Sequence, residues 1–267
     1  MSKSYSLSLI FPTLNERKNL EILVPQFYKL LEELYKDFEI IIVDDNSTDG
    51  TDKYINHLQN TLSKVIYIKR DEKKSLPLSI FKGINEAKFN NVAWLDADGS
   101  MHINAFSKLA QTHIENPSSV IIGSRFAEGG GYKGIQDVEN TSLLKSLFNV
   151  QKSQDSVFGM VLSNLFNKFL SLFYKSDIKD ITSGFIITPK KYITKSAFMN
   201  CVYGEYFIYL VANFLEQNIK IIEVGYICET RLNGVSKTAP NLIVLVKRGI
   251  PYVAAAIRCR RKFAKNY

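Results

Sequence analysis

The sequence predicts an α/β protein in which a mostly parallel sheet is flanked by helices. Short apolar segments alternate with longer amphipathic segments through the first 95 residues, which is the order expected of βαβ units. One short segment, Glu-Ile-Ile-Ile-Val at 39–43, is a β-branched run typical of a buried parallel strand. Polar clusters follow three of the expected strands, and ligands of such sheets bind beyond the carboxyl ends of the strands.

Six strands and five helical stretches are expected along the chain. The strands are expected at residues 5–11, 39–43, 65–68, 92–95, 120–123 and 219–224. Helices are expected at 19–35, 51–62 and 79–88, with two further helical stretches between residues 143 and 174. In the last of these, Phe158, Leu165 and Phe169 share one broad apolar face. Core packing is the first interpretation of that face, and a helix that faces lipid or acceptor is the alternative.

Positive charge is concentrated at the carboxyl end of the chain. The 267 residues have a formal net charge of +8, and residues 241–267 hold seven basic residues and no acidic one. A basic, apolar-rich segment suits an anionic membrane surface. Docking on the chain's own body and pairing with a second subunit in a homo-oligomer are the alternatives. Nucleic acid is not expected as a partner, because no nucleic-acid-binding motif accompanies the charge.

The composition favours a cytoplasmic protein that lies peripherally on the inner face of a membrane. Its three cysteines lack CxxC spacing, so neither a disulfide framework nor a zinc site is expected. The first residues lack the pattern of a signal peptide. The most apolar stretch, residues 242–257, is interrupted by Lys247, Arg248 and Pro251 before it reaches the ~20 residues of a membrane span.

Three polar clusters lie where the expected strands end: residues 12–16, 44–49 and 96–98. Asp96 and Asp98 are two residues apart, so both can approach one divalent cation, or one can ligate it while the other holds a ribose or sugar. Hard carboxylate ligands suit Mg²⁺ or Mn²⁺ bound together with substrate phosphates. Taken alone, an Asp-x-Asp pair is also consistent with a polar turn, and Asp44-Asp45 with a capped turn.

Taken together, the polar segments resemble the motifs of the family 2 glycosyltransferases, which have the GT-A (Rossmann-like) fold. The match is closest to the polyprenyl-phosphate sugar transferases of the dolichyl-phosphate mannose synthase type, and it covers roughly residues 5 to 240. The segments are Pro12-Thr-Leu-Asn-Glu16, Val43-Asp-Asp-Asn-Ser-Thr-Asp-Gly-Thr51, Asp96-Ala-Asp98, Gly123-Ser-Arg125, Asp180-Ile-Thr-Ser-Gly-Phe185 and Arg231-Leu-Asn-Gly-Val-Ser-Lys237.

The resemblance implies a donor site, a metal and an acceptor site. Asp98 would ligate Mg²⁺ or Mn²⁺, with Asp96 beside it. The residues implied for the nucleotide are Pro12, Leu14, Glu16, Val43, Asp45, Asp96 and Ala97, and the implied catalytic cations are Arg125, Arg231 and Lys237. On the acceptor side, Ser163 would match a serine of the helix that binds the acceptor phosphate. Asp180 and Glu205 are the candidates for a general base if the acceptor is a hydroxyl group.

Departures from the family pattern concern mainly the acceptor. Gly159 stands where the family usually has an arginine, one helical turn before Ser163. Ser100 lies near the place of a glutamine after the metal motif, and Ile186 follows the Gly-Phe pair where an arginine is usual. The long C-terminal membrane spans of some members are not expected here.

The sequence therefore predicts an inverting transferase that moves a sugar from a UDP- or GDP-sugar to a polyprenyl phosphate at the membrane. Residues 1–240 would form the catalytic domain, with 1–126 as the nucleotide-sugar half and 127–240 as the acceptor half, and 241–267 would form the basic amphipathic tail. Transfer to a hydroxyl acceptor in cell-surface glycan synthesis and an inactive nucleotide-sugar-binding scaffold remain as alternatives. A sugar nucleotidyltransferase is disfavoured, because residues 12–16 offer no Gly-rich triphosphate loop.

Overall fold

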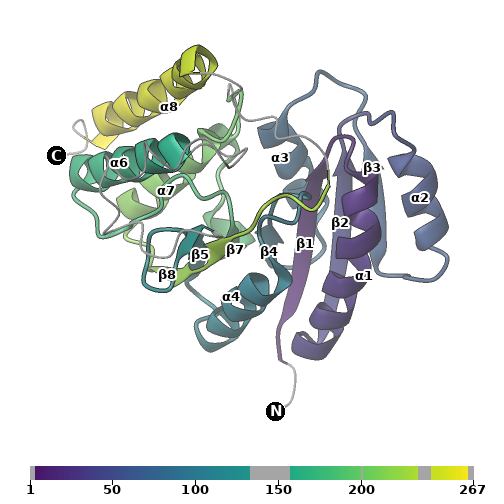
Figure 1. Cartoon of the computed structure of the whole chain (residues 1–267). Helices are drawn as coiled ribbons and strands as arrows, with labels where there is room; N and C mark the ends of the chain where they lie inside the picture. The colour runs from purple at the N-terminus through teal and green to yellow at the C-terminus, as the bar shows by residue number, and fades with distance from the viewer. Residues whose placement is uncertain (1–3, 133–156, 200, 234–241, 264–267) are drawn as a thin grey trace.

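A seven-stranded sheet forms the centre of the protein, and helices cover both of its faces (Figure 1). The computed structural model describes residues 4–132, 157–199, 201–233 and 242–263. The strand order is β3-β2-β1-β4-β7-β5-β8. The strands are β1 (Ser6–Thr13), β2 (Asp37–Asp44), β3 (Val65–Lys69), β4 (Asn91–Trp94), β5 (Val120–Ser124), β7 (Ile186–Pro189) and β8 (Ile221–Gly225). A separate parallel pair joins β6 (Gly131–Tyr132) to β9 (Ile227–Cys228).

The predicted α/β class with a mainly parallel sheet is confirmed, with one antiparallel exception. Strand β7 runs antiparallel to β4 on one side and to β5 on the other. This strand is not among those expected from the sequence. Ile186–Pro189 is only four residues long and buried throughout, so it shows no polar alternation that would distinguish it from any short apolar segment.

Alternating side chains of the central strands build two cores. Leu7, Leu9 and Phe11 of β1 face the core under α1, α2 and α4, whereas Ile10 faces the core under α3 and α7. This two-sided burial explains why the central strands are apolar at nearly every position. The helices are α1 (Arg17–Leu34), α2 (Thr51–Leu58), α3 (Leu76–Glu86), α4 (Ile103–Glu115), α6 (Val157–Tyr174), α7 (Tyr206–Glu216) and α8 (Leu242–Phe263), with 3-10 turns at Lys190–Tyr192 and Lys195–Ala197.

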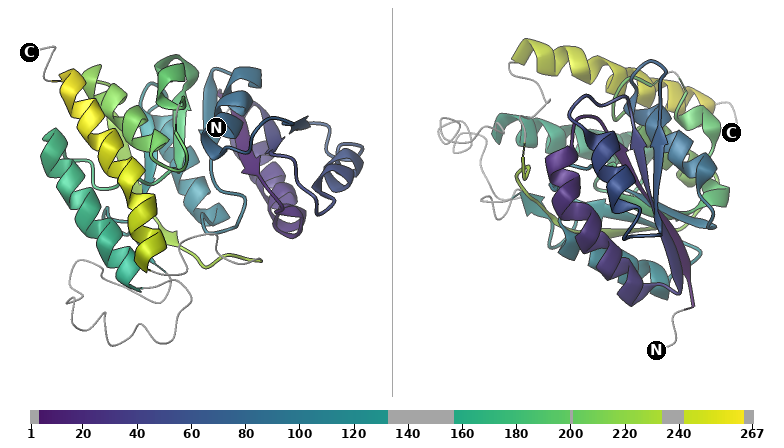
Figure 2. Two further views of the ribbon diagram at one scale, coloured as in Figure 1. Left: turned by 90° about the horizontal axis from the view of Figure 1, so that it is seen from above. Right: turned by 90° about the vertical axis from the view of Figure 1, so that its right-hand side faces the viewer.

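Helix α8 lies against the body of the protein beside α6 and over α7 (Figure 2). Ala255 and Ala256 are buried there, and the Tyr174 hydroxyl donates to the Ala256 carbonyl at 3.0 Å. The basic C-terminal segment is thus packed on its own chain over residues 242–263. Of the two helical stretches expected between residues 143 and 174, the second is α6, and the first falls outside the described residues. In the described part of the chain, no helix combines the length and apolarity that a membrane crossing requires.

A buried histidine makes the stability of this fold sensitive to acid. His113 of α4 is fully buried, and burial lowers its pKa to about 4. Its Nδ1 lies 3.3 Å from the Tyr35 hydroxyl, and its Nε2 has no hydrogen-bond partner within the described residues. In the unfolded chain the pKa is about 6.5, so below that pH the unfolded state binds a proton that the folded state excludes. Stability should therefore fall between pH 6.5 and 4, by about 3 kcal/mol in total from this group.

Urea titrations of the wild type and of His113→Asn at pH 7 and pH 5 would measure this effect. The difference in unfolding free energy between the two pH values should be smaller in His113→Asn than in the wild type, because the variant lacks the titrating group. His57 of α2 is exposed, so His57→Asn is the control and should leave the pH dependence as it is. An unchanged pH dependence in His113→Asn would contradict the assignment.

Candidate active site

Three carboxylates and one arginine meet where β1 and β4 end. These strands are parallel neighbours, with Ser8 opposite Val92 and Ile10 opposite Trp94, so the residues after them emerge at the same edge of the sheet. Glu16 follows β1, and Asp96 and Asp98 follow β4. Arg231 reaches both sides: its Nη2 lies 3.0 Å from Asp98 Oδ2 and its Nη1 lies 3.4 Å from Glu16 Oε1. The structure thus brings together three of the residues predicted for donor and metal with one predicted cation.

The surroundings of this cluster raise the pKa of Asp96. Desolvation by the surrounding protein is the main cause, and the neighbouring Asp98 carboxylate adds to it, while Arg231 acts in the opposite direction. The Asp96 side chain is nevertheless exposed to solvent at the edge of the cluster, so water screens part of these interactions. Three carboxylates against one guanidinium leave an excess of negative charge that a cation would relieve.

The residues present fit a divalent cation that is shared with a substrate. Asp96 and Asp98 supply hard oxygen ligands, which suit Mg²⁺ and Mn²⁺. Among the described residues, no group of three or more potential ligands could hold a metal by itself. A cation at Asp96 and Asp98 would accordingly take its remaining ligands from donor phosphates and water, which is how Mg²⁺ is usually bound.

A buried ion pair lies beyond the end of β2. Asp45 accepts a hydrogen bond from Arg70 through Oδ1 and another from the backbone N–H of Ser75 at 2.5 Å through Oδ2. Arg70 also donates to the Ser79 hydroxyl at 2.9 Å, and both charged side chains are buried. Desolvation raises the pKa of Asp45. No motif in the sequence marks Arg70, and its place shortly after the expected strand at 65–68 is the one local signal for it.

The loop after β1 and the loop after β2 are joined by hydrogen bonds. The Asn15 backbone N–H donates to the Ser47 hydroxyl at 2.8 Å, and Thr48 N–H donates to the Asn15 side chain at 2.8 Å. Asp44 accepts from the Ser47 N–H at 2.9 Å and from the Tyr67 hydroxyl at 2.7 Å. Both carboxylate oxygens of Asp44 therefore already accept hydrogen bonds within the protein.

The other residues predicted for the nucleotide lie at the ends of these strands. Pro12 and Val43 are both buried and lie opposite each other on β1 and β2. Leu14 is half-buried. Ala97, which stands between Asp96 and Asp98 in the sequence, is buried.

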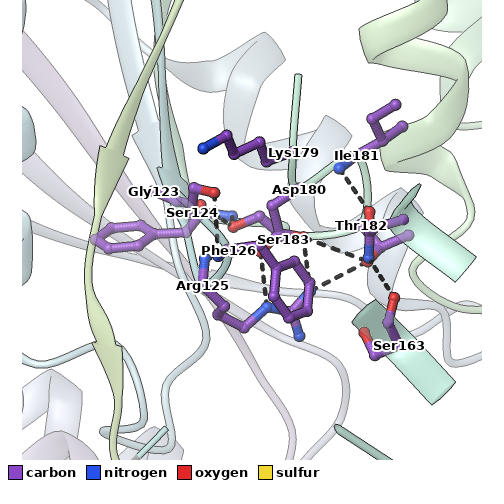
Figure 3. A network of polar contacts seen from close by, with 12 residues as sticks. Gly123, Ser124, Arg125, Phe126, Ser163, Lys179, Asp180, Ile181, Thr182 and Ser183 are labelled. Carbon is purple, nitrogen blue, oxygen red and sulfur yellow. Dashed lines mark hydrogen bonds and ion pairs between the residues drawn. The ribbon is translucent and has the colours of Figure 1, made fainter. Parts of the chain in front are cut away.

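A second charged network holds Arg125 beside α6 (Figure 3). The fully buried Asp180 accepts from Arg125 Nε at 2.8 Å, from Arg125 Nη2 at 2.8 Å and from its backbone N–H at 2.9 Å. Arg125 Nη2 also lies 3.1 Å from the Thr182 hydroxyl. Asp180 and its hydrogen bonds raise the pKa of Arg125. The carboxylate of Asp180 thus positions Arg125, and this geometry does not favour a general-base role.

Helix α6 is tied to the same network through Asn167. Its side-chain amide donates to the Thr182 hydroxyl at 2.8 Å and to the Ser163 carbonyl at 2.9 Å, and its oxygen accepts from Ile181 N–H at 2.7 Å. Ser163 is half-buried one turn away on α6 and hydrogen-bonds to Tyr132. Asn167 was not singled out in the sequence analysis, because an asparagine on an apolar helix carries no motif of its own.

Glu205 is likewise occupied by backbone donors. It is 3% exposed, and its two oxygens accept from the N–H groups of Val202 at 2.6 Å and Tyr203 at 2.8 Å. This arrangement shapes the turn that precedes α7. Lys237, the remaining predicted cation, lies outside the described residues.

Comparison with known proteins identifies the family. The family model described as "Glycosyl transferase family 2" matches residues 8–196. A dolichol-phosphate mannosyltransferase of Pyrococcus furiosus is 32% identical over 187 residues, which is 70% of this chain and 47% of that protein. A dolichol-phosphate mannosyltransferase of Saccharomyces cerevisiae is 30% identical over 129 residues, which is 48% of each chain. The chain spans about half the length of these curated relatives.

Solved structures support the fold. Glucosyl-3-phosphoglycerate synthase from Mycobacterium tuberculosis, determined with Mn²⁺, UDP and phosphoglyceric acid, matches 96% of this chain and 78% of its own with a TM-score of 0.61 at 13% identity. The match confirms the predicted GT-A fold. With the family model covering most of the chain, the protein belongs to glycosyl transferase family 2, in which it is related to the dolichol-phosphate mannosyltransferases.

Proposed function

We propose that this protein transfers a sugar from a nucleoside-diphosphate sugar to a polyprenyl phosphate at a membrane surface, with inversion at the anomeric carbon. The convergence of Glu16, Asp96, Asp98 and Arg231 at the edge of the sheet carries the proposal, because it supplies carboxylates for a cation and a guanidinium for phosphate within one site. The relatives named dolichol-phosphate mannosyltransferase support the choice of acceptor class.

The state of the two candidate bases favours an acceptor that is already anionic. A hydroxyl acceptor needs a group that removes its proton. Asp180 is buried and paired with Arg125, and Glu205 is buried with both oxygens bound to backbone N–H groups. A phosphate acceptor needs no such base, so catalysis can rest on positioning and electrostatics.

Each part of the site has a role in this mechanism. Asp45 with Arg70, at the end of β2, would accept from N–H or ribose O–H groups of the nucleoside. A divalent cation at Asp96 and Asp98 would offset the negative charge that builds on the diphosphate as it leaves. Arg231, next to these carboxylates, would bind the diphosphate or the acceptor phosphate, since a guanidinium matches phosphate bidentately. Arg125, Ser163 and Lys237 are proposed for the acceptor side.

An exposed apolar surface on α6 and α8 supports docking to a membrane. Among the side chains of the two helices whose burial the structure describes, seven large apolar ones are at least 40% exposed: Leu162, Leu165, Phe169, Leu172, Ile250, Val253 and Ile257. We call this set the α6–α8 surface. The helices touch between its two halves, where Phe166 meets Tyr252 and Arg260 lies over the Phe173 ring. Exposed Lys247, Arg258 and Arg260 add the positive charge that anionic headgroups attract.

Introducing negative charge on the apolar α6–α8 surface should weaken membrane binding without unfolding the protein. Leu172 is 80% exposed, and Phe169 is 49% exposed with its ring stacked on Phe173, so Phe169→Glu with Leu172→Glu leaves the buried core of α6 in place. In co-sedimentation with anionic vesicles, the double variant should bind about tenfold or more weakly, because the two side chains together lose at least ~1.5 kcal/mol of apolar burial in the lipid.

The matched control is Ile22→Glu, an apolar side chain of similar exposure at 41% on α1, the helix that lies on the other side of the molecule from α6 and α8 (Figure 1). It should bind vesicles as the wild type does. Wild-type binding by the Phe169→Glu, Leu172→Glu variant would exclude the α6–α8 surface as the docking face, and with it this support for a peripheral location on the inner face of the membrane.

The direct test of function is a donor panel. UDP- and GDP-sugars are incubated with Mg²⁺ or Mn²⁺ and a short polyprenyl phosphate, and the lipid product is identified by mass spectrometry. The expected result is a glycosyl phosphate lipid together with released nucleoside diphosphate. Transfer only to hydroxyl-bearing glycans would overturn the acceptor class. Donor binding without turnover in any lipid extract would favour a nucleotide-sugar-binding scaffold.

A further inference from the structure

Residues 229–233 are held against the metal motif by their backbone. Glu229 N–H donates to the Ser100 carbonyl at 2.9 Å, and Leu232 N–H donates to the Asp98 carbonyl at 3.0 Å. The Asn19 side chain on α1 also donates to the Asn233 carbonyl, at 3.3 Å. The segment therefore spans from the loop after β4 to the first turn of α1, with Arg231 in the middle of it.

The side chain of Leu232 packs against the loop that carries the metal motif. Its side chain lies so close to Gly99 that a Cβ atom built on that residue would come within 2.5 Å of Leu232 Cγ. Gly99 also has φ +83°, which side chains rarely adopt, so glycine is required here on two grounds. The close approach keeps residues 229–233 near the carboxylates.

Both oxygens of Asp98 are engaged in this arrangement. Oδ1 accepts from Ser100 N–H at 2.9 Å, and Oδ2 is 3.0 Å from Arg231 Nη2. Asp98 is only 7% exposed, so water does little to replace these partners. A divalent cation that ligates the same carboxylate would lie within a few ångströms of the guanidinium, and the two like charges would repel each other strongly in so buried a place.

We propose that Arg231 and the divalent cation are alternative counter-ions of Asp98, so that residues 229–233 form a latch that metal and donor open together. The inference rests on the proposed function for the identity of the donor as a nucleoside diphosphate. Arg231 would leave Asp98 when a divalent cation binds there, and its guanidinium would then pair bidentately with the donor diphosphate. The latch therefore disfavours binding of metal alone and couples metal binding to donor binding.

If Arg231 competes with the metal for Asp98, removing the positive charge of Arg231 should tighten metal binding. Mn²⁺ is titrated into the 267-residue protein and free Mn²⁺ is followed by electron paramagnetic resonance, first with Mn²⁺ alone and then with saturating UDP or GDP. Arg231→Gln should bind Mn²⁺ alone about tenfold more tightly than the wild type. The gain in Mn²⁺ affinity caused by the nucleotide should be about tenfold smaller in Arg231→Gln.

Two further variants make the test specific. Leu232 is 46% exposed, so Leu232→Ala should fold normally, loosen the latch with Arg231 intact, and tighten Mn²⁺ binding about threefold. Arg17→Gln is the control, because Arg17 is a nearby exposed arginine that pairs with Glu21. It removes one positive charge without touching Asp98 and should leave Mn²⁺ affinity within about twofold of the wild type. A general loss of structure would weaken metal binding, which is opposite to the expected sign.

Equal or weaker Mn²⁺ binding in both Arg231→Gln and Leu232→Ala would overturn the latch. Failure of the proposed function is detected separately by the donor panel. If the wild type transfers sugar but the variants bind Mn²⁺ with unchanged affinity, the proposed function is supported and the latch is rejected. If Arg231→Gln binds Mn²⁺ more tightly but the protein turns over no donor, the latch is supported and the proposed function is rejected.

Discussion

Replacing Asp98 with alanine should abolish sugar transfer, with a loss of about a thousandfold or more in turnover whatever the acceptor is. A bound cation stabilises the leaving diphosphate by several kcal/mol, and each 1.4 kcal/mol corresponds to about tenfold in rate. Asp98 is the carboxylate best placed to hold that cation, since it is buried and anchored by Ser100 N–H. The measurement is the rate of nucleoside diphosphate release and of glycolipid formation at saturating Mn²⁺.

Asp98→Asn should lose nearly as much, because it keeps the shape of the side chain and removes its charge. Asp71→Asn is the control for loss of a carboxylate, since the Asp71 side chain is 77% exposed and pairs only with Lys69 among the described residues. It should retain full activity. If Asp98→Ala with an unchanged melting temperature kept wild-type turnover, the assignment of the metal site to the end of β4 would have to be abandoned.

The second large effect is on stability. Asp180→Ala should lower the free energy of unfolding by about 3–5 kcal/mol, because it leaves the Arg125 guanidinium largely buried without its counter-ion. Asp180 is fully buried and Arg125 is 16% exposed, so water replaces little of the lost interaction. Chemical denaturation of the purified variant would measure the change.

A double-mutant cycle separates the loss of the pair from the loss of either side chain. Asp180→Ala combined with Arg125→Met should be more stable than Asp180→Ala alone, because no uncompensated charge remains. The exposed pair Lys82–Glu86 on α3 has a similar separation of 2.9 Å and serves as the matched control. Its coupling energy should be below about 1 kcal/mol. A coupling energy equally small for Arg125 and Asp180 would mean that solvent reaches this network.

The donor side was more predictable from the sequence than the acceptor side. Motifs at residues 12–16, 44–51 and 96–98 are local, and their place after β-branched runs predicts that they meet at one edge of the sheet. The acceptor side depends on contacts between distant segments. Asn167 of α6 meets Thr182, and Asp180 meets Arg125, 55 residues away along the chain. No local pattern reveals which of two polar side chains is buried as the partner of the other.

The sequence by itself determined the fold class, the succession of strands and helices along the chain through β4, and the family, because these depend on hydrophobic periodicity and on short motifs that are readable along the chain. Tertiary structure alone decided the insertion of β7 as an antiparallel strand and the packing of α8 on α6 and α7. It also decided that Asp180 and Glu205 are occupied by Arg125 and by backbone N–H groups. Burial and pairing depend on which surfaces meet, so side chains that look equally able to act as bases in the sequence acquire structural roles once the chain has folded.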